Sequence, residues 1–358
     1  MNDQLRLIGD SALRLFEDLS LASRANTLDA GGFGRLWERI TESGFCLLFR
    51  AEKDGGFGGG WNEAFAVIEA AGRCALALPL PEAMLANKLL DDAGAAPRDG
   101  VCTLALRTDG KLQRHSGRAP RFTGCMRAVP WGRYASDVIG GIYLGSDYFL
   151  CHARVADAAS LQQYANVAGE PRDNLFFRDA ETTLYGPLGD SLTILRQGAL
   201  VRAIQIAGAS AASLELSLRH ANERSQFGKP IGKFQAIQHQ LAIFAEQNAA
   251  VQRVSRDACA MFADGNGDLA AAIAKLRANI AVDTATAVAH QVHGAMGFTA
   301  EYALHPLTRR MMSWRSEFGS DVFWSKHIGG IVAAAGPAGF WPLITAGRAM
   351  QPSDVAHA

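Results

Sequence analysis

From about residue 190 onward, the chain carries three long runs in which apolar residues recur every three or four positions. Each run is longer than an ordinary surface helix, so each needs neighbouring helices on which to bury its apolar stripe. A helix bundle satisfies all three runs at once. The apolar positions are Ile204, Ala207, Ala211, Leu214 and Leu218; Ile237, Leu241, Phe244, Val251 and Val254; and Leu269, Ile273, Leu276, Ile280, Val288 and Val292.

A further helical stretch starts near Phe323, so we expect four bundle helices. Its continuation, residues 328–344, is almost entirely apolar or small, but glycines and prolines interrupt it. A membrane-spanning helix needs about 20 consecutive apolar residues, a length that this segment barely reaches. We therefore expect the segment to pack on its own protein or on a partner subunit, and we expect no membrane span.

The pattern of apolar residues changes near residue 100. Residues 1–99 show mainly helical spacing, whereas residues 100–188 contain short β-prone runs separated by turn signals such as Asp109-Gly110. A βαβ rhythm and a dinucleotide fingerprint are both missing, which disfavours a Rossmann fold. The predicted fold class is α+β, with an N-terminal helical domain (1–99), a middle antiparallel β domain (100–188) and a C-terminal four-helix bundle (189–358).

A glycine-rich loop at residues 54–60 precedes a helical run from Trp61 to Cys74. A Walker A loop would continue with Lys-Ser or Lys-Thr, which this sequence lacks, and the glycine spacing does not fit GxGxxG. The loop is therefore predicted to connect two helices rather than to bind phosphate.

Charge and cysteine usage exclude several classes of protein. Lys and Arg total 35 and Asp and Glu total 35, so the basic excess typical of a nucleic-acid-binding protein is missing. The six cysteines are scattered and form no CxxC pair, which favours free thiols in a reducing compartment. The N-terminal residues show no apolar run of the kind found in signal peptides. We therefore expect a cytoplasmic protein.

Metal and hydrolase chemistry find little support. His290 and His293 lie three residues apart, but carboxylates at matching positions on other helices are missing, so these histidines are expected to form local hydrogen bonds. Glu301 and His305 have the wrong spacing for a di-iron motif, and no GxSxG elbow is present. The metal prediction is none.

Two segments could bind a ligand. Residues 224–239 form a tight connection in which Arg224 offers a planar guanidinium suited to a pyrophosphate and Phe227 offers an aromatic face. Residues 291–301 close the third long run, and Gly294 and Ala295 would allow close approach to the backbone. Taken singly, each segment could equally be an ordinary turn or a glycine helix stop.

Together and in this order, the two segments resemble the acyl-CoA dehydrogenase family, whose motifs are R-x-x-F-G-x-x-[I/L]-x-x-x-Q-A and Q-x-x-G-G-x-G-[F/Y]. The three-part organisation is similar over the whole chain. The resemblance implies FAD held between the β domain, the bundle and a neighbouring subunit, hence a homodimer or homotetramer. It implies FAD contacts by Arg224, Phe227, Gln235, Gln291, Gly294 and Ala295, the last in place of the usual second glycine.

The resemblance also implies the chemistry. A carboxylate would remove the α-proton of an acyl-CoA thioester, the β-hydrogen would leave as hydride to FAD, and an electron-transfer flavoprotein would accept the electrons. Counted without gaps, the place of the family's catalytic Glu holds Phe318. Glu317, one residue earlier, is the candidate base. The second position used by some members holds Gly198 and Ala199, which cannot act as bases.

Three alternatives follow for this chain. Glu317 is the base; or the chain is a non-catalytic, FAD-contacting subunit of a heteromeric (heterotetrameric) dehydrogenase; or the chemistry differs, as in an oxidase. Outside these roles, Glu317 would be an exposed carboxylate paired with Arg315 or Arg310. The segment Arg127-Ala-Val-Pro130 also departs from the family, which has a Trp and a hydroxyl residue there, and the family's Asp/Arg pair near the thioester is missing.

Overall fold

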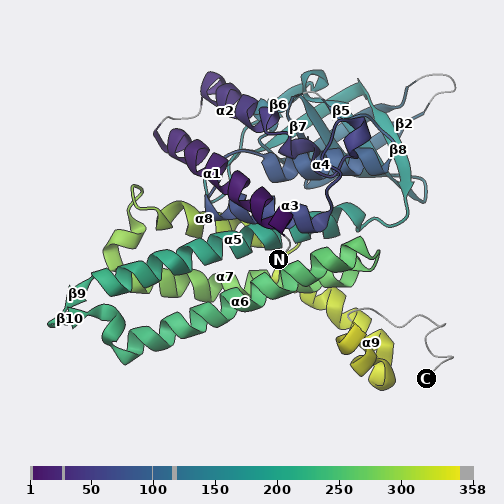
Figure 1. Cartoon of the computed structure of the whole chain (residues 1–358). Helices are drawn as coiled ribbons and strands as arrows, with labels where there is room; N and C mark the ends of the chain where they lie inside the picture. The colour runs from purple at the N-terminus through teal and green to yellow at the C-terminus, as the bar shows by residue number, and fades with distance from the viewer. Residues whose placement is uncertain (1–2, 26–28, 99, 115–118, 347–358) are drawn as a thin grey trace. The chain divides into compact units, whose positions relative to one another are not determined.

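The structure is a computed structural model that describes residues 3–25, 29–98, 100–114 and 119–346. Two compact units make up the chain, residues 1–198 and 199–358, and each is described by itself. The fold class is confirmed: N-terminal helices are followed by largely antiparallel sheets and then by a helical region (Figure 1). The division of the first unit into two domains stays a prediction, and its boundary at residue 99 lies outside the described residues.

Four α-helices open the first unit. They are α1 (Asp3–Ala25), α2 (Ala30–Glu42), α3 (Trp61–Arg73) and α4 (Leu80–Asp92). The Asp29 carboxylate caps α2 by accepting the Gly32 N–H at 2.6 Å, which satisfies a backbone donor left free at the helix start. The glycine-rich loop before α3 folds back on the preceding turn, because the Gly58 N–H donates to the Arg50 carbonyl at 2.7 Å. It connects two helical segments, as predicted.

Within the described residues of this unit, eight strands form two four-stranded sheets. One sheet has the order β1-β4-β5-β8 and the other β2-β3-β7-β6. All pairings are antiparallel except that of β1 with β4, which is parallel and differs from the predicted all-antiparallel domain. A parallel pair needs a long connection between its strands, and β2 and β3 provide it here. The strands are β1 (Cys102–Leu104), β2 (Arg107–Gln113), β3 (Arg121–Pro130), β4 (Asp137–Leu144), β5 (Asp147–Arg154), β6 (Ser160–Gln162), β7 (Arg172–Glu181) and β8 (Thr183–Leu188).

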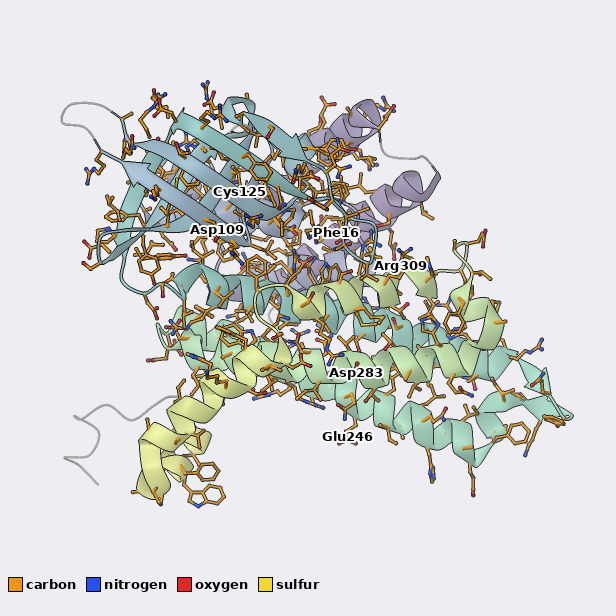
Figure 2. The ribbon with its side chains drawn as sticks, turned by 180° about the vertical axis from the view of Figure 1, so that it is seen from behind. Phe16, Asp109, Cys125, Glu246, Asp283 and Arg309 are labelled. Carbon is orange, nitrogen blue, oxygen red and sulfur yellow. The ribbon has the colours of Figure 1, made fainter. Side chains whose placement is uncertain are left out.

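The two sheets share a core of buried side chains that includes Phe122, Met126, Val138 and Leu175. The Cys151 side chain belongs to the same core. Cys125 of β3 is also buried, and Figure 2 shows it among the strands. All six cysteines are free, as their scattered spacing predicted, and burial raises the pKa of the Cys151 thiol to about 12. The raised pKa disfavours the thiolate, so Cys151 behaves as a small apolar residue rather than as a nucleophile.

A fully buried carboxylate organises one edge of the sheets. Asp173, at 0 % exposure, accepts hydrogen bonds from the Arg133 guanidinium at 2.6 Å and from the Arg133 backbone N–H at 2.8 Å. The Tyr164 backbone N–H donates to it at 3.2 Å. A buried charge is tolerated only when it is paired and hydrogen-bonded. Asp173 therefore holds Arg133 and the backbone at Tyr164 in one arrangement.

Five helices occupy residues 193–346, the C-terminal part of the chain that the structure describes. They are α5 (Thr193–Glu223), α6 (Gln235–Ala263), α7 (Gly267–His293), α8 (Leu304–Ser316) and α9 (Asp321–Ala346). A three-residue connection joins α6 to α7, and the two helices lie side by side (Figure 1). The prediction of four helices missed α8. This helix has a proline in its first turn and three arginines further along, so it shows no long apolar stripe.

The buried face of α7 differs from the predicted one. Ile273 and Ile280 were expected in the core but are 39 % and 48 % exposed, whereas Ala274, Ala278 and Ala281 are fully buried. Small side chains let neighbouring helices approach closely, so an alanine face packs inward although isoleucine is more apolar.

Two helices are unusually apolar. The described helix α5 is long and apolar enough to cross a bilayer, but 78 % of its apolar window is buried inside the protein, as in the core helix of a bundle. Helix α9 contains the apolar segment 328–344 and is kinked at Gly336, which precedes Pro337. Several of its apolar side chains are exposed, Trp341 by 69 %, so this single chain does not cover them.

We predict that Asp173→Ala lowers the free energy of unfolding by about 3 kcal/mol, because it leaves buried donors and the Arg133 guanidinium without their acceptor. The measurement is urea unfolding followed by circular dichroism. The control is Asp157→Ala, which removes the ion pair with the exposed Arg154 and should change stability little. Equal effects of the two substitutions would contradict a special role for Asp173.

Candidate dinucleotide pocket and the Glu317 segment

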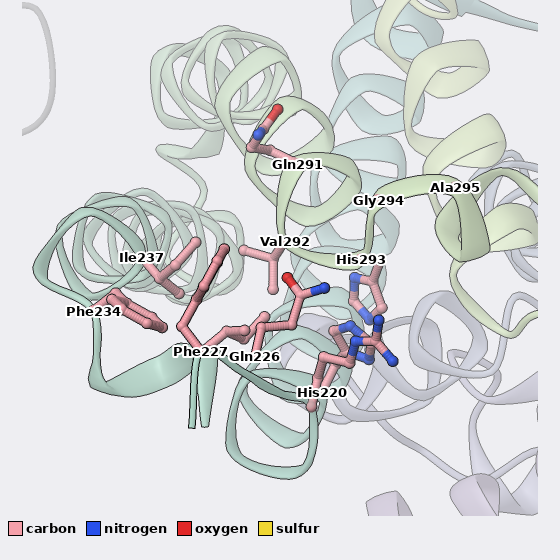
Figure 3. Close-up of a pocket in the computed structure, with 12 residues that line it drawn as sticks. His220, Gln226, Phe227, Phe234, Ile237, Gln291, Val292, His293, Gly294 and Ala295 are labelled. Carbon is pink, nitrogen blue, oxygen red and sulfur yellow. The ribbon is translucent and has the colours of Figure 1, made fainter. Parts of the chain in front are cut away.

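A pocket of about 430 Å³ lies at one end of the bundle, where α5 leads into a short hairpin and where α7 ends (Figure 3). One part of its wall is apolar and aromatic, and the other part carries imidazoles and a guanidinium. Its lining residues are His220, Arg224, Gln226, Phe227, Ile231, Phe234, Ile237, Gln291, Val292, His293, Gly294 and Ala295.

Five of the six predicted cofactor-binding residues line this one pocket. The sixth, Gln235, is the first residue of α6; it is exposed and does not line the pocket. Two motifs more than 60 residues apart therefore meet in space. The five are Arg224, Phe227, Gln291, Gly294 and Ala295.

The hairpin projects Phe227 out of the protein surface. Its strands are β9 (Ser225–Gln226) and β10 (Lys229–Pro230), joined by Phe227 and Gly228 with φ of 53° and 81°. Two positive φ angles characterise the tight turn that best fits the twist of a hairpin. A phenylalanine rarely adopts this conformation, and its ring is 91 % exposed, which is costly unless another molecule covers it.

The end of α7 supplies the opposite wall. Gly294 has φ 61° and ψ −143°, and a Cβ built on it would meet no atom within 4 Å. The backbone is therefore open to the pocket at this point, which suits close approach by a ligand. Ala295 follows it in the wall.

Two histidines that the sequence analysis did not assign to this site complete it. The rings of His220 and His293 are stacked, with centroids 4.7 Å apart, and both face the same end of the pocket (Figure 3). His293 Nδ1 bonds to the Ala289 carbonyl oxygen at 2.7 Å, so Nδ1 carries the hydrogen. His290 bonds to Thr308 at 3.1 Å. Local hydrogen bonding by His290 and His293 agrees with the prediction.

The charges of the lining fit an anionic dinucleotide. None of the lining residues carries a carboxylate, whereas Arg224 and the two imidazoles can donate to phosphate oxygens. Phe227 and Phe234 lie at the opposite end, where a flat aromatic group could stack (Figure 3). Among the described residues, no group of three His, Cys, Asp or Glu side chains could hold a metal ion.

Glu317, the candidate base, lies directly after α8 and is only 6 % exposed. Its carboxylate accepts hydrogen bonds from the Arg202 guanidinium, Nε at 2.8 Å and Nη2 at 2.7 Å. Arg202 comes from α5 and is completely buried. The prediction that Glu317 would be exposed outside a catalytic role was therefore wrong, and so was its pairing with Arg315, which pairs with Asp283 and Asp321 instead.

Phe318 is the residue that a count without gaps places where the acyl-CoA dehydrogenase motif has its catalytic Glu. It is also buried. It has φ 52°, a strained value for an aromatic residue, and its ring lies 5.6 Å from the Arg202 guanidinium carbon. The Trp324 indole N–H donates to its carbonyl at 3.0 Å. The turn after α8 is therefore held by contacts from two other helices.

Lys275 of α7 stabilises the same turn by hydrogen bonds to backbone carbonyls at the end of α8. Its ammonium donates to the carbonyl oxygens of Trp314 at 3.0 Å and Arg315 at 2.9 Å, and to Asn279 Oδ1 at 2.6 Å. A cation at a helix C-terminus satisfies carbonyls that lack partners in the helix. Burial lowers the pKa of Lys275 to about 7, and Glu317 acts in the opposite direction.

A second pocket, of about 610 Å³, lies on the β-sheet unit. Its charges are largely neutralised within the wall, because Arg121 pairs with Asp179 and Arg154 pairs with Asp157. The carboxylate-free pocket of the bundle is therefore the stronger candidate site.

Comparisons with known proteins agree with this geometry. Residues 190–324 match the family model described as acyl-CoA dehydrogenase, C-terminal domain. The acyl-CoA dehydrogenase IpdE2 of Mycobacterium tuberculosis is 27 % identical over 296 residues, covering 79 % of this chain and 81 % of that protein.

Solved structures share the fold. The ChsE4-ChsE5 complex from Mycobacterium tuberculosis contains a chain with a TM-score of 0.84 at 20 % identity, covering 93 % of this chain and 98 % of that one. The FAD complex of PigA has a TM-score of 0.80 at 18 % identity, covering 94 % and 99 %. At these identities the likeness concerns the fold.

For Lys275 the structure predicts a pH-dependent stability. Its folded pKa of about 7 lies below the ordinary lysine value of 10.5, so between these values the unfolded chain binds the extra proton and stability rises with pH. Relative to Lys275→Met, the free energy of unfolding of the natural chain should rise by up to about 1.4 kcal/mol per pH unit.

Urea unfolding at several pH values above neutral measures this difference. Lys326→Met, which changes an exposed lysine of α9, is the control and should follow the pH profile of the natural chain. A Lys275→Met variant with the same pH profile as the natural chain would contradict the assigned pKa.

Proposed function

We propose that this chain, which is similar to acyl-CoA dehydrogenases in sequence and fold, acts as a member of that family of FAD-dependent oxidoreductases and takes part in the α,β-dehydrogenation of an acyl-CoA thioester. The observation that carries the proposal is the pocket in which Arg224 and Phe227 meet the end of α7. We further propose an electron-transfer flavoprotein as the electron acceptor and a cytoplasmic location, in keeping with six free cysteines.

When bound, FAD supplies the acceptor for the β-hydrogen of the substrate. In our proposal the residues of this chain hold its dinucleotide part. The Arg224 guanidinium, for which the described residues show no ion pair, binds the pyrophosphate oxygens. Phe227 contributes an aromatic face, and Gly294 and Ala295 let the ligand approach the backbone.

We propose that a second chain covers this pocket. Phe227 is 91 % exposed, and Ile273 and Ile280 on α7 and Trp341 on α9 also leave apolar surface uncovered. Exposed apolar side chains in such number are typical of a surface that binds another protein. A homodimer, a homotetramer or a heterotetramer with a related subunit would each provide the cover.

Two versions of this function differ in the source of the base. In the first, Glu317 removes the α-proton. In the second, the chain is the FAD-contacting subunit of a heteromeric dehydrogenase, and its companion carries the base. The geometry favours the second, because Glu317 is buried and its carboxylate is held by two donors of Arg202. A base must instead come within hydrogen-bond reach of the substrate.

The FAD contact is tested with Arg224→Gln. We expect FAD binding to weaken about 10- to 100-fold, because a hydrogen bond to a charged group contributes about 1.5–3 kcal/mol. Flavin absorbance retained after gel filtration and titration of the FAD-free protein measure the effect. Arg219→Gln, on the same helix but outside the pocket, is the control. A natural chain that neither purifies with flavin absorbance nor takes up FAD would overturn the proposed function.

The source of the base is tested by comparing Glu317→Gln with the double variant Arg202→Met plus Glu317→Leu. Removing one partner of a buried ion pair costs about 3–5 kcal/mol, whereas replacing both partners by apolar residues is often neutral. If the companion carries the base, the double variant regains stability and keeps full turnover of acyl-CoA with that companion present.

The opposite outcome is equally clear. If Glu317 is the base, the chain alone turns over an acyl-CoA with an artificial acceptor, and both variants lose about 10²- to 10⁴-fold in rate. Loss of turnover in the stable double variant would therefore contradict the heteromeric version.

A further inference from the structure

The stacked histidines at the polar end of the pocket have no role in the function proposed so far. His220 belongs to the last turn of α5 and His293 is the last residue of α7, so two separate helices bring them together. Their rings lie 4.7 Å apart at an interplanar angle of 24°. Figure 3 shows them opposite the aromatic end, so a dinucleotide in the pocket would pass beside them.

His293 is the more buried partner. It is 5 % exposed, its Nδ1 donates to the Ala289 carbonyl, and its Nε2 has no hydrogen-bond partner within the described part of the chain. A buried imidazole nitrogen without a partner costs free energy. A ligand hydroxyl could donate a hydrogen bond to this Nε2, whereas a phosphate oxygen, which is itself an acceptor, can bond to it only after Nε2 has taken up a proton.

The surroundings of both imidazoles favour the neutral form when the pocket is empty. Burial lowers the pKa of His220, and the neighbouring His293 and Arg224 lower it further, while Glu223 acts weakly in the opposite direction. Burial also lowers the pKa of His293, and the hydrogen bond to the Ala289 carbonyl oxygen acts in the opposite direction. Each neutral imidazole therefore has one ring nitrogen that could accept a proton when a ligand binds.

An anion would reverse this balance. The pocket wall contains a guanidinium and two imidazoles without any carboxylate, so a bound pyrophosphate is the missing counter-charge. A negative charge within a few ångströms of an imidazole favours its protonated form. The protonated ring then donates a charge-assisted hydrogen bond to a phosphate oxygen.

We propose that His220 and His293 form a proton-linked binding element for the phosphates of the dinucleotide, taking one proton from solvent as the ligand binds. The inference rests on the proposed function, because FAD is the dinucleotide of that function. It adds a specific consequence: FAD affinity rises as pH falls through the range in which the complex holds the proton and the empty pocket does not.

Other titratable groups around the pair do not replace it. On α5, the charged neighbours of the pair are Arg219, Glu223 and Arg224, none of which is an imidazole. Next to α8, the Tyr302 ring lies 5.1 Å from His293, and its pKa is raised, so it stays neutral. His290 and His305 also have lowered pKa values, but neither lines the pocket.

The experiment titrates the FAD-free full chain, in the assembly in which it purifies, with FAD between about pH 6 and pH 8.5, a range that brackets the ordinary pKa of an imidazole. Calorimetry in two buffers of different ionisation enthalpy counts the protons taken up. We expect up to one proton per FAD and an affinity that falls by up to about tenfold per pH unit as pH rises.

The double variant His220→Gln plus His293→Gln keeps hydrogen-bonding side chains but cannot take up the proton. It should bind FAD about as well as the natural chain at the highest pH and severalfold more weakly at the lowest, with little proton uptake. His305→Gln is the matched control, because it removes a histidine of lowered pKa outside the pocket, and its pH profile should be unchanged. A loss of affinity that is equal at every pH would indicate a structural role and overturn the proposal.

The possible failures are distinguishable. A natural chain that binds FAD with pH-independent affinity and without proton uptake would overturn the proton-linked element and leave the proposed function standing. A chain that binds no FAD in any assembly would overturn both.

Discussion

The burial of α5 is the constraint on which the C-terminal unit depends. A helix of 31 residues that is apolar on nearly all sides must be surrounded, so its central part has no route to water. Arg202 lies in that part and needs a buried carboxylate, because an unpaired charge in a protein interior is too costly. Glu317 supplies it from the turn after α8. The turn is then fixed further by Lys275, whose ammonium binds the last carbonyls of α8.

This arrangement bears directly on function. The Glu317 carboxylate is held by its hydrogen bonds to the buried Arg202 guanidinium. The ring of Phe318 lies against the same guanidinium. The segment that would carry the base in a self-sufficient dehydrogenase is thus occupied by an ion pair that the core requires. The same helix behaves differently at its other end. Where α5 emerges from its neighbours, His220 and Arg224 become available to a ligand.

The exposed apolar surface fits a protein that works in an assembly. The hairpin holds Phe227 in a rarely adopted backbone conformation with its ring outside the protein, and α7 turns its isoleucines outward while its alanines pack inside. A solitary chain would gain nothing from either feature. The second subunit that we propose to cover the pocket would account for both features, and the apolar surface of α9 would extend the area available for such contacts.

The sequence alone determined the order of helices, sheets and bundle, and it brought out the motifs whose residues Arg224, Phe227, Gln291 and Gly294 line one pocket. Helical spacing and turn chemistry depend on residues a few positions apart, so they can be recognised locally. Only the tertiary structure decided that Glu317 pairs with Arg202, 115 residues away, that His220 stacks on His293, and that α7 buries alanines instead of Ile273 and Ile280. These outcomes depend on how separate helices pack, and a single arginine, histidine or isoleucine carries no signal of its distant partner.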